Sequence, residues 1–177
     1  MNNALYLGLI LNIVAYLACC GLVFNSKTWG TIRSMFIITY LSMVIWGFGY
    51  LFAGSQLTSN PFILWPFLET IQIVTWSSLL LAIIDSKQNK LGEFLRNKYV
   101  LIIFAAAIIF NLTLNFSYLS PDTKFKLLIS GGLLGSIVQL ILLEQIYRNA
   151  ADQKWAYKPL ILGLATINIF HLICNTV

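Results

Sequence analysis

The sequence predicts an all-α membrane protein, a polytopic bundle of about six transmembrane helices with its N-terminus outside the cytoplasm. Two observations predict this fold class. Of the 177 residues, 59% are hydrophobic and only 10% are charged, whereas soluble domains carry about 45–50% apolar and about 25% charged residues. The charged residues also gather in short stretches, and the apolar runs between them approach the roughly 20 residues that cross a bilayer as a helix. This composition excludes a water-soluble enzyme and a disordered tail.

Six apolar runs predict the spans, and together they form one transmembrane domain over residues 1–177. They cover residues 5–24, 34–53, 62–84, 99–119, 127–147 and 159–176. Within lipid only helices and closed barrels satisfy every backbone polar group. A barrel strand alternates polar and apolar residues, and these runs show no such alternation. The spans are therefore predicted to be helices.

The connections between the spans predict their orientation. The connection at 54–61 has no Lys or Arg, and the others contain Lys27 and Arg33, then Lys87, Lys90, Arg96 and Lys98, then Lys124 and Lys126, and finally Arg148, Lys154 and Lys158. The odd-numbered connections thus carry nine basic residues and the even-numbered ones two. Because cytoplasmic loops are rich in Lys and Arg, the odd-numbered connections are predicted to be cytoplasmic.

The net charge of +5 follows from these basic connections. They indicate topology and contact with the anionic headgroups of a lipid bilayer rather than binding of nucleic acid. The chain has a single histidine and no CxxC motif, so we expect no metal site and no cofactor. Since the last run stops at Val177 on the predicted external side, we expect the chain to be the N-terminal part of a longer protein.

Polar side chains inside the spans are the main functional candidates, because such residues are costly in lipid. They lie one turn apart on three predicted helices: Glu69 and Gln72, then Asn111 and Asn115, then Asn168, His171 and Asn175. All seven are predicted to lie in the outer half of the bilayer. One hypothesis is an outward-facing polar cavity that senses protons or binds a polar ligand, with Glu69 and His171 as its titratable members. The alternative is that they join helices by hydrogen bonds of about 0.6–2 kcal/mol each.

Two further motifs lie in the fifth span and at its end. The pairs Gly131/Gly135 and Gly132/Ser136 are small residues four apart, a spacing that lets another helix approach closely. Glu144 and Arg148 are also four apart, which favours an ion pair at the end of the helix, or simply an interfacial anchor. No set of residues has the acid–base or nucleophile arrangement of an enzyme, so no catalytic residue is predicted.

The segment 144–164 contains Glu144, Tyr147 and Arg148 followed by Trp155 and Lys158. It resembles the membrane-embedded N-terminal region of PrsK-type sensor histidine kinases, which belong to PEP-CTERM/exosortase exopolysaccharide systems. Residues 26–52, and Leu68-Glu69 followed by Trp76, look similar more loosely. Where that family suggests a basic residue soon after Glu69, this chain has Thr70-Ile71-Gln72.

The resemblance implies a sensor in the bacterial inner membrane. Its partners would be a cytoplasmic output domain, with GAF and kinase parts, in the parent protein, and a second copy in a homodimer. Our hypothesis for the mechanism is that a ligand or a protonation change in the cavity shifts the helix packing around Gly131 and Gly135, and that residues 144–158 pass the change to the output. The chain contains no phospho-acceptor box and no ATP-binding box, so the resemblance assigns it sensing and not catalysis.

Two alternatives remain open. A stand-alone transporter would use the same cavity for its substrate. Its two helix triplets, spans one to three and spans four to six, would rock against each other, as in inverted-repeat transporters. A membrane assembly subunit would use the small-residue face of the fifth span for a partner.

Overall fold

The computed structural model describes residues 3–25, 30–53, 61–85, 91–116 and 118–149. Within these ranges the chain is all-helical, with helices α1 (Asn3–Asn25), α2 (Gly30–Ala53), α3 (Pro61–Ile84), α4 (Leu91–Leu95), α5 (Lys98–Phe116) and α6 (Pro121–Asn149). Five of them, all except α4, are long and apolar enough to cross a membrane. The prediction of a multi-pass helical membrane protein is therefore confirmed for the first five spans.

Two parts of the fold prediction stay predictions. The sixth span, 159–176, lies outside the described residues. The orientation in the membrane is predicted from the charge of the connections.

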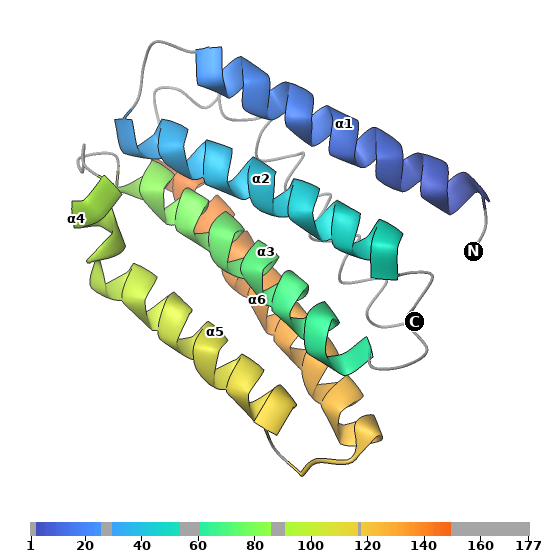
Figure 1. The fold of residues 1–177 in the computed structure, drawn as a ribbon. Coiled ribbons are helices and arrows are strands. Elements are labelled where there is room, and N and C mark those ends of the chain that lie inside the picture. Colours follow the sequence, from blue (N-terminus) through green and yellow to red (C-terminus); the bar gives the residue numbers. More distant parts are fainter. Residues whose placement is uncertain (1–2, 26–29, 54–60, 86–90, 117, 150–177) are drawn as a thin grey trace.

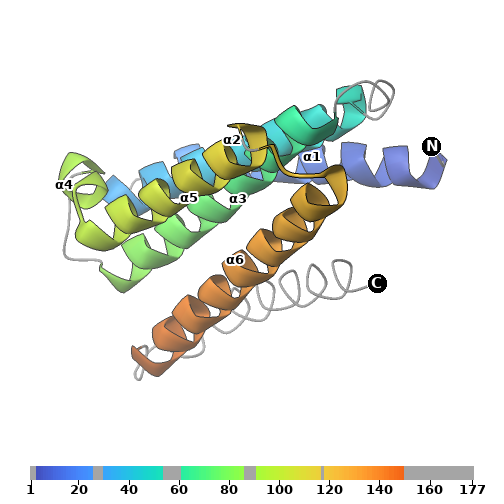
Figure 2. The same cartoon turned by 90° about the horizontal axis from the view of Figure 1, so that it is seen from below.

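The long helices α1, α2, α3 and α5 lie side by side, and α6 crosses behind α3 (Figures 1 and 2). Helix α1 packs on α2, α2 packs on α3, and α3 packs on both α5 and α6. Helix α3 therefore contacts helices from both predicted triplets, and the triplets are not separate packing units in the described part of the chain.

Burial explains why α3 is the central helix. Over its candidate span 56% of the residues are buried, compared with 11% in α1 and in α5. Trp76, Ser77, Ser78, Leu79 and Leu80 are consecutive and all buried, which places every face of this part of α3 inside the bundle. A helix with buried residues all round lies within a core, whereas α1 and α5 present long apolar faces to the surroundings.

The buried core lies toward the end of the bundle where α3 and α6 finish and α5 begins. It contains Met35, Met43, Trp76, Leu79, Leu80, Ala82, Phe94, Val100, Leu142, Leu143 and Ile146. Phe94 comes from α4, a helix of only five residues in the long third connection, and its side chain is fully buried. The sequence predicts only a connection between spans here. In the structure, Phe94 of this segment packs in the core.

Polar contacts fix the same end of the bundle. The Asn97 side chain donates from Nδ2 to Asp85 Oδ2 at 3.2 Å, and its Oδ1 accepts from the backbone N–H of Tyr99 at 3.0 Å. Asn97 thus ties the end of α3 to the start of α5 and caps the first turn of α5. On α2, Arg33 donates to the backbone oxygen of Phe24, near the end of α1, so this basic residue also caps a helix C-terminus.

Candidate functional site

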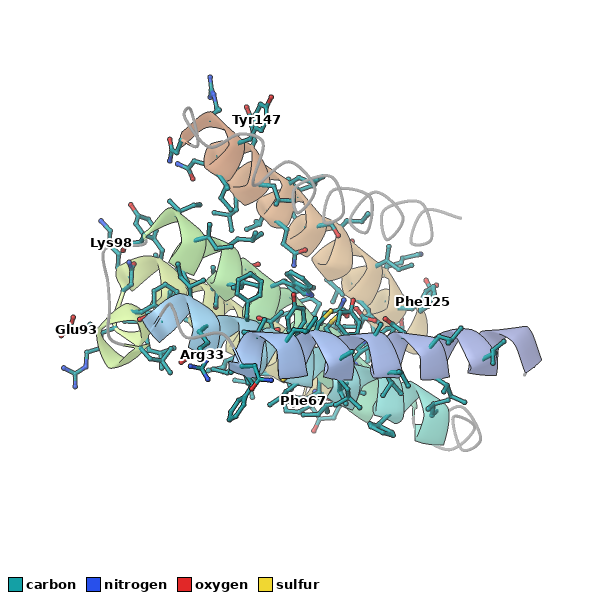
Figure 3. All side chains as sticks on the ribbon, turned by 90° about the horizontal axis from the view of Figure 1, so that it is seen from above. Arg33, Phe67, Glu93, Lys98, Phe125 and Tyr147 are labelled. Carbon is teal, nitrogen blue, oxygen red and sulfur yellow. The ribbon has the colours of Figure 1, made fainter. Side chains whose placement is uncertain are left out.

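A groove of about 650 Å³ lies between α2, α3 and α5, and we name it the α2–α3–α5 groove. Its lining residues are Ile38, Phe67, Thr70, Ile71, Val74, Thr75, Phe104, Ala107, Ile108, Asn111, Leu112 and Asn115. Phe67 lies away from the end of the bundle that holds Glu93 and Lys98 (Figure 3). The volume falls within the range of about 300–1,000 Å³ that is usual for small-molecule sites.

The groove contains Asn111 and Asn115, two of the residues that the sequence singled out. Each donates from Nδ2 to the carbonyl four residues earlier on its own helix, Ala107 and Asn111 respectively, both at 3.0 Å. Both Oδ1 atoms are buried and have no hydrogen-bond partner among the described residues. A buried acceptor left unpaired costs about 1–3 kcal/mol, so these oxygens need an explanation.

Glu69 and Gln72 do not line this groove. Trp46 on α2 donates from Nε1 to Glu69 Oε1 at 3.2 Å, so Glu69 connects α3 to α2. Gln72 is buried, and its Oε1 has no hydrogen-bond partner among the described residues. The seven residues of the predicted polar cavity are therefore not in one described site, and Asn168, His171 and Asn175 lie outside the described residues.

A group of hydroxyls between α2 and α3 was not singled out from the sequence. The Oγ of Ser42 and the Oγ1 of Thr75 lie 2.8 Å apart in a hydrogen bond, and Thr39 donates from Oγ1 toward the Thr75 carbonyl at 3.2 Å. Thr39 and Ser42 are three residues apart, so they share one face of α2. That spacing inside an apolar run is the signal that could have found them.

Replacing Ser42 by alanine is expected to lower the free energy of unfolding by about 0.6 kcal/mol and by at most about 1.7 kcal/mol, the average and the maximum for hydrogen bonds between membrane helices. The half-buried hydroxyl of Thr75 then loses its partner across the helix interface. Ser130→Ala is the matched control, since Ser130 is exposed and its hydroxyl donates to the Lys126 carbonyl of its own helix. Unfolding in detergent micelles measures both, and equal losses would contradict an interhelical role for Ser42.

The small residues of α6 pack inside this chain. A Cβ atom added at Gly131 would overlap the ring of Phe110 on α5, and one added at Gly135 would lie 2.8 Å from Ile73 on α3. Gly132, between them, is partly exposed. At Gly131 and Gly135 the close approach expected of such a pattern is thus made by helices of the same chain.

The predicted coupling residues lie at the other end of α6. Arg148 Nη1 and Glu144 Oε1 are 3.8 Å apart, and both side chains are largely exposed. Exposed ion pairs contribute little to stability. Tyr147 is 44% exposed and lies at this end of α6 (Figure 3). Trp155 and Lys158 lie outside the described residues.

Replacing Asn111 by leucine is expected to leave the free energy of unfolding unchanged or to raise it, by at most about 1–3 kcal/mol. The substitution removes the unpaired buried oxygen and loses a hydrogen bond only to a carbonyl of its own helix. Thr113→Val, at an exposed position two residues further along α5, controls for a polar-to-apolar change. A clear loss of stability in Asn111→Leu alone would indicate that the amide is a structural bridge.

Neither metal-binding side chains nor the comparisons with known proteins assign a function to this site. Among the described residues, no three His, Cys, Asp or Glu side chains are placed to hold a metal ion. The chain matches no protein-family model, no curated protein and no solved structure.

Proposed function

We propose that this chain is a membrane sensor or signal-transduction module, in which a ligand in the α2–α3–α5 groove changes how α6 packs on α3 and α5. The supporting observation is that groove residues and α6 contacts are neighbours on the same two helices. On α3, Val74 lines the groove and Ile73 packs on Gly135. On α5, Asn111 lines the groove and Phe110 packs on Gly131.

This arrangement supports coupling for a physical reason. A ligand that shifts α3 relative to α5 also moves Ile73 and Phe110, which fill the spaces left by the α6 glycines. Close-packed interfaces respond by changing between discrete packings. A ligand selects one packing only by the difference between its affinities for the two states, so the groove must differ in shape or in hydrogen bonding between them.

The proposed output lies beyond α6. Helix α6 carries Glu144, Tyr147 and Arg148 in its last two turns, at the predicted cytoplasmic end. In the proposal, residues 144–158 pass the change to a cytoplasmic GAF and kinase domain in a longer parent protein of the bacterial inner membrane. The resemblance of residues 144–164 to PrsK-type sensors supports this part of the proposal.

The first experiment measures the mass of the endogenous protein by immunoblot, with an antibody against residues 85–98. A band far above the 20.0 kDa of this chain, lost when the downstream reading frame is deleted, is expected for a sensor with a fused output domain. A band near 20.0 kDa would overturn the fused-output proposal.

The second experiment tests the coupling in the parent protein. Its phosphotransfer activity is compared between the wild type, Asn111→Leu and the exposed-face control Thr113→Val, in membranes. Asn111→Leu is expected to change the stimulus dependence, and Thr113→Val is not. Solute uptake by liposomes that contain only this chain, with no partner domain, would instead favour a transporter.

A further inference from the structure

We infer that the ligand of the α2–α3–α5 groove is an uncharged, mainly apolar molecule with a hydrogen-bond-donating head group, such as a long-chain alcohol, which enters from the bilayer. This inference rests on the proposed function, because it names the chemistry of the molecule that the proposed sensor binds. It depends on the charge, hydrogen bonding and shape of the groove.

The charge of the lining excludes an ionic ligand. Eight of the twelve lining residues are apolar, and the other four are the uncharged side chains of Thr70, Thr75, Asn111 and Asn115. A carboxylate, phosphate or ammonium group would lie here without an opposite charge, in a region where lipid replaces water. Burying an unpaired ion in such surroundings is strongly unfavourable.

The hydrogen bonds of the lining select a donor. Thr70 donates to the Pro66 carbonyl at 2.6 Å and Thr75 lies 3.1 Å from the Gln72 carbonyl, so these hydroxyls already have acceptors on their own helix. Asn111 and Asn115 each donate in the same way. Within the described part of the chain, the polar atoms left unpaired at the groove are the two Oδ1 atoms, and carbonyl oxygens only accept. A matching ligand must therefore supply an O–H or N–H group.

The side-chain torsions allow this contact. The Oδ1 atoms are buried in the structure, but the χ2 torsion of asparagine has a broad minimum. In the inference, binding therefore includes a rotation of one carboxamide that exposes its Oδ1 to the groove. Asn111 and Asn115 are one turn apart, so a single head group can reach either of them.

The shape of the groove fits a long molecule. Its lining on α5 extends from Phe104 to Asn115, which is roughly 16 Å along a helix. The asparagines lie at one end and Phe104 at the other, so the donor head and the apolar tail have separate places. Phe67, Phe104 and Ile108 are exposed apolar lining residues from α3 and α5, and in a membrane such residues face lipid. The groove therefore opens sideways into the bilayer.

The test uses the full chain in phosphatidylcholine nanodiscs and three photoactivatable probes with the same diazirine-bearing C16 chain: an alcohol, its methyl ether and the carboxylic acid. Labelled peptides are identified by mass spectrometry. The alcohol is expected to label residues 67–75 and 104–115, roughly 2- to 10-fold more than the ether, as one hydrogen bond implies. Asn111→Leu/Asn115→Leu should bring this ratio close to one, and Thr113→Val should leave it unchanged.

Three results would overturn the inference. Equal labelling of the groove by alcohol and ether would make it a general lipid-facing cleft. Stronger labelling by the acid, at a pH where its carboxyl group is ionised, would contradict the uncharged ligand, and labelling confined to other helices would exclude the groove. The probe comparison on the wild-type chain gives an answer even if a variant folds poorly. Because labelling needs no signalling output, donor-selective labelling combined with an unchanged output in Asn111→Leu would count against the proposed sensor function and leave the binding site standing.

Discussion

Replacing Phe94 by alanine is expected to lower the free energy of unfolding by about 3–5 kcal/mol, the usual cost of deleting a buried aromatic side chain. Phe94 has 0% exposure and belongs to the core cluster with Val100 and Ile146. Its helix, α4, has five residues, which is too short to be stable without packing. Loss of the ring therefore removes both a core side chain and the anchor of α4.

The neighbouring residue offers a matched control. Leu95 is on the same short helix but is 40% exposed, so Leu95→Ala removes a large apolar side chain without opening the core. We expect a small change in this control and a large one in Phe94→Ala, both measured by thermal unfolding in the same detergent. Equal losses of stability in the two variants would contradict the role of Phe94 in stabilising the core.

The long helices could be predicted because the bilayer sets their length. The residues at which they begin and end could not be predicted in the same way. Helix α6 begins at Pro121, six residues before the predicted start at residue 127. Ser120 accepts a hydrogen bond at Oγ from the Thr123 N–H, so Ser120 is an N-cap and Pro121 takes the first helical position. Hydropathy locates the hydrocarbon crossing, but the capping residues locate the end of the helix.

Helix α4 shows a second limit of sequence reasoning. Residues 85–96 contain charged and polar side chains and read as a connection, yet Phe94 is fully buried. Five residues are too few for a hydrophobic period to be recognised. The burial of Phe94 depends on where α3, α5 and α6 meet, and that meeting point is a property of the tertiary structure.

The candidate site was predictable in part. Spacing placed Asn111 and Asn115 on one face of a helix, and both line the groove. Spacing could not show that Glu69 contacts Trp46 on α2, because packing sets the rotation of each helix against its neighbours. The hydroxyls of Thr39, Ser42 and Thr75 were missed because serine and threonine can satisfy their hydrogen bonds within their own helix. Only the three-residue spacing of Thr39 and Ser42 indicates a shared face, and spacing does not identify the partner on α3.

Replacing Gly135 by alanine is expected to lower the free energy of unfolding by about 1–3 kcal/mol, the usual cost of overpacking. The added Cβ would lie 2.8 Å from both Cγ2 and Cδ1 of Ile73 and 3.1 Å from its Cγ1. Isoleucine is β-branched and has one strongly preferred χ1 rotamer in a helix. Cγ2 therefore cannot move away by a simple rotation, and α3 and α6 must separate instead.

Gly21→Ala separates this clash from the general effect of alanine on a helix. A Cβ at Gly21 meets nothing within 4 Å, so this variant should gain about 0.5–1 kcal/mol through the better helix propensity of alanine. Adding Ile73→Ala to Gly135→Ala should recover part of the loss, because residues in contact do not behave additively. A Gly135→Ala protein as stable as Gly21→Ala in the same unfolding assay would show that the α3–α6 contact yields easily. The proposed coupling would then lose its basis, since an interface that accepts an extra methyl group without cost does not hold α6 in one packing against the groove.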